Sequence, residues 1–130
     1  MKTINPESLG RPRGYTNGLL TTTGARMLFV AGQIGWDENQ RLVSEDFVEQ
    51  FDRALRNVLA VVNEAGGTPD GVARLVVYVT DKREYSARTR EIGECWRALM
   101  GRHFPAMTLV EVSALLEDGA KVEIEGIAVL

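Results

Sequence analysis

Hydrophobic residues recur at helical spacing in two stretches of the chain, and each predicts a helix with one buried face. We predict that Ser44 is the N-cap of the first helix, and that Asp81 and Glu84 form a capping box that opens the second. Gly66 and Gly101 follow the last periodic residues and are expected to end the two helices. The predicted buried stripes consist of Phe47, Phe51, Leu55, Val58, Leu59 and Val62 in the first helix, and of Tyr85, Ile92, Trp96 and Leu99 in the second.

Shorter apolar runs predict strands before, between and after these helices. Residues 15–22 and 26–33 are expected to form a hairpin around Thr23-Gly24-Ala25. Residues 75–80 are β-branched and apolar on both faces, which is typical of a central strand. Two more strands are predicted in the last two dozen residues, where they are joined by a turn that contains Gly119.

The last two predicted strands carry glutamates within otherwise apolar sequence. Side chains alternate between the two faces of a strand, so residues two apart share a face. A face that mixes Met, Leu and Ile with three glutamates is neither a plain core nor a plain solvated surface. We therefore expect it to be buried by something beyond this domain. The residues assigned to this face are Met107, Leu109, Glu111 and Ser113 from the first strand, and Glu123, Glu125, Ile127 and Val129 from the second.

The order of predicted elements is β-β-α-β-α-β-β, within one domain that spans residues 1–130. Two helices cannot cover both faces of a sheet with this many strands. The sequence therefore predicts a two-layer α+β fold with both helices on one face. Self-association through the other face is the physical expectation.

The composition is that of an ordinary globular protein, with 130 residues, 45% hydrophobic and 25% charged. The net charge of −3 argues against a nucleic-acid partner, because phosphate binding needs clustered Lys and Arg. A single cysteine excludes an internal disulfide bond. No apolar run approaches the roughly 18 residues of a membrane span, and the first residues lack an apolar signal core, so we expect a cytoplasmic protein with no membrane partner.

Several sequence motifs resemble those of one known family. Phe104 begins F-P-A-M-T-L-V-E-V, and Gly119 begins G-A-K-V-E-I-E-G-I-A-V. Upstream, Phe29 begins F-V-A-G-Q-I, and Tyr15 follows R-P-R-G. Together these segments resemble the RidA family, also called YjgF or UK114. The resemblance implies a chorismate-mutase-like chain that assembles into a homotrimer around a closed barrel, with a cleft for a small-molecule ligand between neighbouring subunits.

The resemblance also implies roles for individual residues. Glu123 matches the glutamate that positions the attacking water in the family, and is the candidate catalytic residue. A structural carboxylate bonded across the subunit interface is the alternative, and it is the interpretation that we favour for Glu111 and Glu125. The candidate substrate-binding residues are Tyr15, Ala31, Gly32, Trp36, Thr89, Met107 and Leu109.

Position 107 departs from the family pattern. Imine-hydrolysing members have an arginine there, whose guanidinium group holds the carboxylate of the substrate through two hydrogen bonds. Met107 has no hydrogen-bond donor. The family often has Cys, Ser and Asn where this chain has Leu109, Ala31 and Thr89, so a neutral or aromatic ligand fits the site better than a simple 2-imino acid. Alternatively, Met107 fills a vestigial cleft, or Arg11 or Arg13 supplies the missing cation.

Other candidate residues have ordinary structural interpretations. Trp36 is either an aromatic wall of the cleft or a loop anchor. Cys95 is expected to be a buried packing thiol, and His103 to lie at the end of the second helix. One His and one Cys provide neither a zinc site nor a Ser-His-Asp or Cys-His arrangement, and no phosphate-binding motif is present, so we predict no metal and no cofactor.

The leading function implied by the resemblance is hydrolysis of a reactive enamine or imine to a carbonyl compound and ammonia. A non-catalytic trimer that binds a small ligand in the same cleft is the alternative. A third activity, endoribonuclease, is a label that the family has carried. The acidic net charge and the lack of a second histidine count against it.

Overall fold

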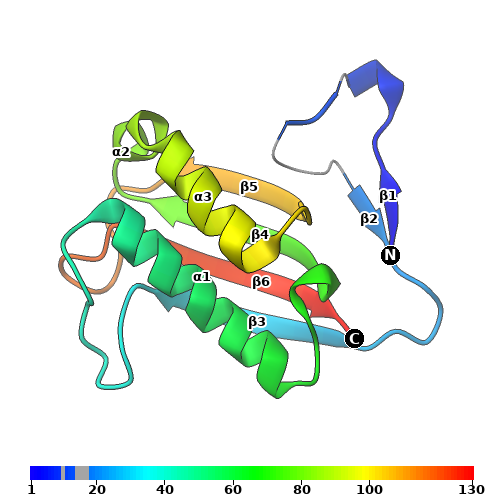
Figure 1. Ribbon diagram of the computed structural model, residues 1–130, viewed down its shortest axis with the longest axis horizontal. Helices are drawn as coiled ribbons and strands as arrows, with labels where there is room; N and C mark the ends of the chain where they lie inside the picture. The colour runs from blue at the N-terminus through cyan, green and yellow to red at the C-terminus, as the bar shows by residue number, and fades with distance from the viewer. Residues whose placement is uncertain (10, 14–17) are drawn as a thin grey trace.

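A computed structural model describes residues 1–9, 11–13 and 18–130 of the chain. Its main body is a four-stranded sheet, with strands in the order β3-β6-β4-β5, packed against helices (Figure 1). The elements are β1 (Lys2–Ile4), the 3-10 helix η1 (Glu7–Leu9), β2 (Gly18–Leu20), β3 (Met27–Ile34), α1 (Phe47–Glu64), the 3-10 helix η2 (Pro69–Gly71), β4 (Val72–Val79), α2 (Lys82–Ala87), α3 (Thr89–Met100), β5 (Ala106–Glu111) and β6 (Val122–Val129).

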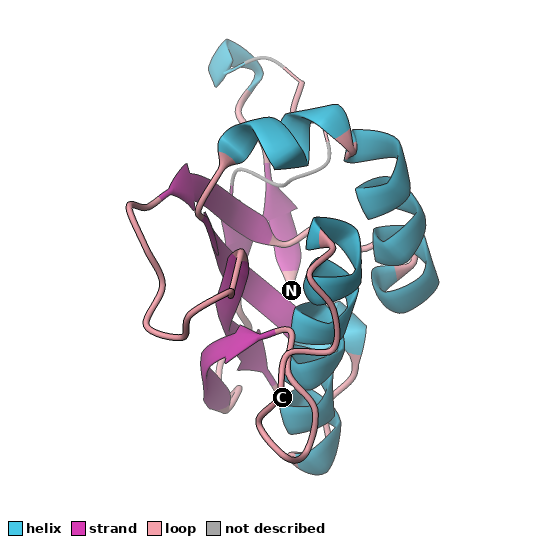
Figure 2. Ribbon diagram, turned by 90° about the vertical axis from the view of Figure 1, so that its left-hand side faces the viewer, coloured by secondary structure: helices cyan, strands magenta, loops and turns pink. Residues whose placement is uncertain are grey.

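The sheet is mixed, and its helices lie on one side. β6 is antiparallel to both β3 and β4, whereas β5 runs parallel to β4. Helices α2 and α3 form the crossover between these two parallel strands. Figure 2 shows the helices on one face of the sheet and no helix on the other. The predicted two-layer α+β class is confirmed.

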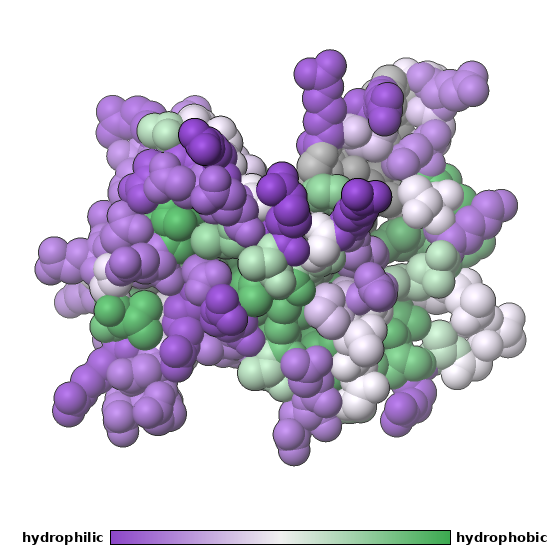
Figure 3. All heavy atoms as spheres, viewed as in Figure 1, coloured by the Kyte–Doolittle hydropathy of each residue, from purple (hydrophilic) through white to green (hydrophobic). Residues whose placement is uncertain are grey.

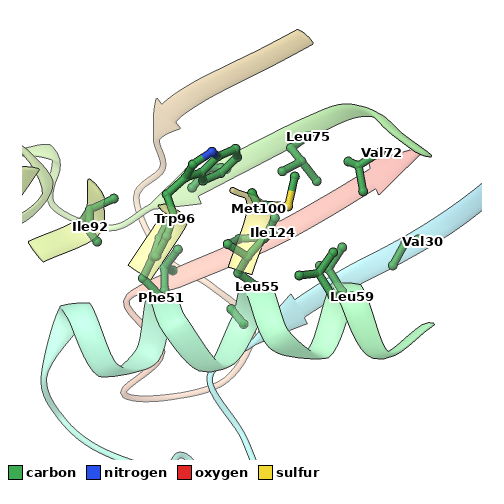
Figure 4. Packing of buried hydrophobic residues seen from close by; sticks show 14 of the residues in the cluster. Val30, Phe51, Leu55, Leu59, Val72, Leu75, Ile92, Trp96, Met100 and Ile124 are labelled. Atoms are coloured by element: carbon green, nitrogen blue, oxygen red, sulfur yellow. The ribbon is translucent and has the colours of Figure 1, made fainter. Parts of the chain in front are cut away.

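The core lies between α1, α3 and the sheet, as Figure 4 shows. The predicted stripe of the first helix is confirmed, because each of its six residues is buried. In β6, buried and half-exposed residues alternate, so one face of this strand packs on the helices and the other does not. The strand residues that are fully buried on the helix side are Val72, Leu75, Val77, Val79, Val122, Ile124 and Ala128.

The predicted N-terminal hairpin is wrong. β2 pairs with β1 in a separate two-stranded ribbon, and β3 pairs with β6 instead. Residues 15–17 of the predicted strand lie outside the described residues. β3 places Val30 in the core, and β6 offers it an eight-residue antiparallel neighbour that also faces α1. The three-residue β2 carries the exposed Leu20 and could not bury that face equally well.

The helix boundaries differ in two places from those predicted. Asp46, not Ser44, is the N-cap of α1, and its carboxylate accepts a hydrogen bond from the Glu49 amide at 3.1 Å. Ser44 instead accepts one from the Asp46 amide at 2.9 Å, which makes a turn just before the helix. The single second helix that we predicted is divided into α2 and α3 at Arg88, whose φ and ψ of −123° and 24° are not helical.

The capping box that we predicted at Asp81 forms only in part. Asp81 is the N-cap of α2 and accepts a hydrogen bond from the Arg83 amide at 2.9 Å. The Glu84 carboxylate points elsewhere and lies 3.2 Å from Lys121 Nζ. Glu84 thereby links α2 to the chain just before β6 instead of returning to the N-cap.

Gln50 ties two loops to α1 from inside the protein. Its side chain is fully buried, and its amide nitrogen donates to the carbonyl groups of Ser44 at 2.9 Å and Gly119 at 3.0 Å. Its amide oxygen accepts from the Lys121 amide at 2.8 Å. One side chain therefore satisfies three backbone groups in the loops that enter α1 and β6, which fixes where β6 begins.

Replacing Gln50 with Leu keeps the volume of the side chain and removes all three hydrogen bonds. We expect the free energy of unfolding to fall by about 2–4 kcal/mol, because buried backbone groups lose their partners. Urea denaturation measures this change. Asn63→Leu, on the exposed end of the same helix, is the matched control and should change stability by less than about 0.5 kcal/mol. Equal effects of the two substitutions would contradict the role of Gln50.

Candidate functional site

An apolar pocket of about 230 Å³ opens between the helices and β5. It brings together three of the predicted substrate-binding residues, Thr89, Met107 and Leu109. Thr89 begins α3, whereas the other two lie on the edge strand β5. The remaining lining residues are Phe51, Val77, Tyr85, Ile92, Gly93, Trp96, Arg97, Gly101 and Phe104.

The pairing of β5 with β4 directs Met107 and Leu109 toward the helices. Met107 lies beside Leu75 and Leu109 beside Val77, and both of these neighbours are fully buried in the core. The prediction that Met107 and Leu109 share a face with Glu123 is therefore wrong. Alternation predicts which residues of a strand share a face, but it does not predict which of the two faces packs on the helices.

Two hydrogen bonds fix the aromatic wall of the pocket. The Trp96 indole nitrogen donates to the His103 carbonyl at 3.1 Å, and His103 Nε2 lies 2.6 Å from the Val72 carbonyl oxygen. The ring of Phe104 stacks on that of Trp96 with 6.1 Å between centroids and an interplanar angle of 2°. His103 thus lies just beyond the second helix, as expected, and holds the turn between α3 and β5 against β4.

Glu123 lies on the opposite, uncovered face of the sheet. It is half-buried and is the register partner of Tyr78. In β3 the register shifts between Val30 and Gln33, so that Ala31 and Gly32 form a bulge beside β6. A Cβ atom at position 32 would collide with Glu123 Oε1, so the carboxylate occupies space that only glycine leaves open.

The other two glutamates of the final strands have hydrogen-bond partners. Glu125 accepts from the Tyr78 hydroxyl at 2.9 Å, and Glu111 accepts from the Lys82 amide at 3.0 Å. The hydrogen bond with Glu125 is the main cause that raises the pKa of Tyr78 above its usual value of 10.0. Within the part of the chain that the structure describes, the Glu123 carboxylate makes no hydrogen bond or ion pair.

The remaining predicted cleft residues are dispersed. Ala31 lines a shallow hollow on the uncovered face together with Glu125 and Ile127. Trp36 does not line the apolar pocket, and its carbonyl accepts from Asn57 Nδ2 at 3.0 Å and Arg53 Nε at 3.1 Å, which anchors the loop on α1. Tyr15 lies outside the described residues.

The only cysteine of the chain is not part of the pocket. Cys95 is half-buried on α3, beside Asp52 and Arg56 of α1, and burial is the first cause that raises the pKa of its thiol. Among the described residues, no three His, Cys, Asp or Glu side chains are arranged to hold a metal ion. No helix in those same residues is both long and apolar enough to cross a membrane.

The sequence alone did not point to the aromatic residues of the pocket as part of a site. Tyr85 and Trp96 were assigned to the buried stripe of the second predicted helix, and Phe104 only to the motif that it begins. All three line the pocket. The division of the second helix at Arg88 also has little signal in the sequence, because arginine is an ordinary helix former.

The chain combines a one-sided α+β sheet, a glycine bulge over Glu123 and a pocket beside an edge strand. Comparisons with known proteins identify the family to which it belongs. The family model described as Endoribonuclease L-PSP matches residues 12–130. A RutC family protein of Pyrococcus abyssi is 35% identical over 102 residues, which are 78% of this chain and 76% of that protein. The chain therefore belongs to the RidA/YjgF/UK114 family.

Two further relatives extend the comparison. A human protein named 2-iminobutanoate/2-iminopropanoate deaminase is 29% identical over 105 residues, which are 80% of this chain and 73% of that protein. The crystal structure of YyfB from Yersinia pestis, a Rid family protein of unknown function, superimposes with a TM-score of 0.87 and 32% identity. The match covers 99% of this chain and 98% of that one.

Proposed function

We propose that the protein hydrolyses a reactive enamine or imine to a carbonyl compound and ammonia. One observation carries the proposal: of the three glutamates in the final strands, Glu123 alone has a carboxylate without a partner in the described residues, and it lies over the space left by Gly32. A carboxylate held in this way is available to bind a water molecule or a ligand. The human relative named as a deaminase of 2-imino acids supports the same type of reaction.

The reaction needs little from the protein beyond positioning. Water adds to the electrophilic imine carbon, forming a C–O bond while the π electrons of the C=N bond move to nitrogen. The Glu123 carboxylate takes a proton from the water and returns it to nitrogen, which gives a carbinolamine. Glu123 then moves the hydroxyl proton to nitrogen, and the C=O double bond forms as the C–N bond breaks and ammonia leaves. Backbone groups at the Gly32 bulge, where the register of β3 against β6 shifts, can orient the substrate, and no redox step is required.

The proposed site is completed by a second copy of the chain. The pocket with Met107 lies on the helix side of the sheet and Glu123 on the other side, so one chain cannot present both to one small ligand. The uncovered face carries the exposed apolar residues Phe29 and Val110. We infer that these faces pack together in a homotrimer, and that the ligand binds where the pocket of one subunit meets Glu123 of the next.

The lining of the pocket determines which substrates fit. Among its described lining residues, Arg97 is the only charged one, and it is exposed at the rim of the pocket. Met107 and Leu109 offer no hydrogen-bond donor to a carboxylate on the reacting carbon. The proposed substrate is therefore an enamine or imine with an apolar or aromatic group, and not a simple 2-imino acid.

A non-catalytic trimer that binds a small ligand is the second candidate function. Its support is the same loss of polar groups from the pocket, since an apolar cavity can hold a ligand without reacting with it. Endoribonuclease activity is less well supported. The chain has one histidine, and its Nε2 is engaged by the Val72 carbonyl, so no histidine pair is available for acid–base cleavage of RNA.

We expect the wild-type protein to accelerate the hydrolysis of iminopropionate only weakly when an amino-acid oxidase generates it in the assay. Met107→Arg should increase binding of this substrate about ten- to a hundredfold, because a charged bidentate contact contributes roughly 1.5–3 kcal/mol. Met107→Gln, which adds polarity without charge, is the control. Rapid turnover of iminopropionate by the wild type would show that the protein does not need a cation at this position.

Glu123→Gln separates the hydrolase from the binding protein. If Glu123 orients and deprotonates water, the substitution should reduce kcat on the true substrate by about 10²-fold or more while ligand affinity changes little. Glu117→Gln, in the exposed loop before β6, is the matched control and should retain full turnover. The Glu123→Gln protein must keep the oligomeric mass and melting temperature of the wild type. Unimpaired turnover by such a variant would rule out the catalytic assignment.

A further inference from the structure

A second cavity, of about 300 Å³, lies where the N-terminal ribbon approaches the turn between α3 and β5. It is formed by two parts of the chain that are distant in sequence. We call it the basic groove, and its lining residues are Thr3, Asn5, Arg11, Pro12, Leu19, Arg102, His103 and Phe104.

All ionisable side chains that line the basic groove are basic. Arg11 comes from the N-terminal segment, Arg102 and His103 come from the turn after α3, and none of the described lining residues is acidic. Neither arginine forms an ion pair within the described residues, whereas Arg83 and Arg88 are each held by carboxylates. In a chain with a net charge of −3, two unpaired guanidinium groups around one cavity form a local site for an anion.

Phe104 connects the basic groove to the apolar pocket. Its ring lines both cavities, is 38% exposed and is held flat against Trp96. A ligand that lies along this ring can therefore reach both cavities. Figure 3 shows hydrophobic atoms between hydrophilic side chains on the side of the molecule that carries the helices.

We propose that the two cavities together bind an organic carboxylate, with its apolar body in the pocket and its carboxylate in the basic groove beside Arg102 and Arg11. This assignment rests on the proposed function only because both use the apolar pocket. It places the carboxylate at the far end of the ligand, several atoms from the carbon that reacts. A substrate of this shape does not need a cation at position 107, which explains how the site can accept an acid while carrying Met107.

Isothermal titration calorimetry with phenylpropionate and its neutral counterpart phenylpropanol tests the proposal on the wild-type protein. The two probes share the aromatic body and differ in the carboxylate. The acid should bind about tenfold more tightly than the alcohol. At an exposed site, the contribution of a charge-assisted hydrogen bond to binding is at the lower end of its usual range. Added sodium chloride should weaken only the acid, because salt screens exposed charges.

Arg102→Gln should remove the preference for the acid and leave phenylpropanol binding unchanged. Arg90→Gln is the matched control, because Arg90 is exposed on α3 and pairs with Glu94. Arg11→Gln tests the part of the groove that the N-terminal segment forms and should reduce the preference as well. These variants are read out by binding alone, so the proposal can fail while the hydrolase assignment stands, and the reverse is also true.

Any one of three results would overturn the proposal. One is equal affinity of the wild type for phenylpropionate and phenylpropanol, which would show that the groove does not bind the carboxylate. Another is a preference for the acid that persists in Arg102→Gln and Arg11→Gln. Acetate that binds as tightly as phenylpropionate would also contradict it, because the anion site would then be separate from the apolar pocket.

Discussion

The rest of the structure depends on one constraint, which is that the helices cover only one face of the sheet. On the covered face, the alternate residues of β4 and β6 are fully buried against α1 and α3. On the other face the same strands carry the half-buried Tyr78, Glu123 and Ile127, and β3 adds Phe29, which is 71% exposed. Water is a poor environment for this apolar surface, so a second chain is the natural cover.

The same constraint separates the two halves of the candidate site. The pocket under α2 and α3 is apolar because Met107 and Leu109 face the core, and Glu123 is accessible because it does not. In the proposed trimer, the apolar half-site of one subunit joins the acidic half-site of the next. The chemistry proposed for the protein then depends on assembly as much as on any single side chain, which is why Glu123 has to be tested in a protein that remains oligomeric.

Much of the fold follows from the sequence, because local patterns determine it. The stripe from Phe47 to Val62 and the central strand β4 were predicted correctly, since helical periodicity and continuous β-branched runs have few alternative interpretations. The partner of β3 could not be predicted in this way. Proximity in the sequence favoured a hairpin, whereas the shared burial against α1 that pairs β3 with β6 is a tertiary effect.

The candidate site was less predictable than the fold. The resemblance identified Thr89, Met107 and Leu109, which the structure brings together, but the relation of Met107 to Glu123 depends on which phase of β5 faces the helices. Arg102 carried no motif, because its position in the basic groove depends on how the N-terminal ribbon folds back on the turn after α3. Such long-range contacts have no local signature in one sequence.

The central claim is that the uncovered face of the sheet is an interface between copies of this chain. Its most direct test is the molar mass in solution at micromolar concentration, measured by light scattering coupled to size-exclusion chromatography. The account predicts the mass of three 14.4 kDa chains, with no change on moderate dilution. A mass of one chain would contradict it. The side chains of Phe29 and Val110 would then remain exposed to water in the native protein, and the pocket could not meet Glu123 in a shared cleft.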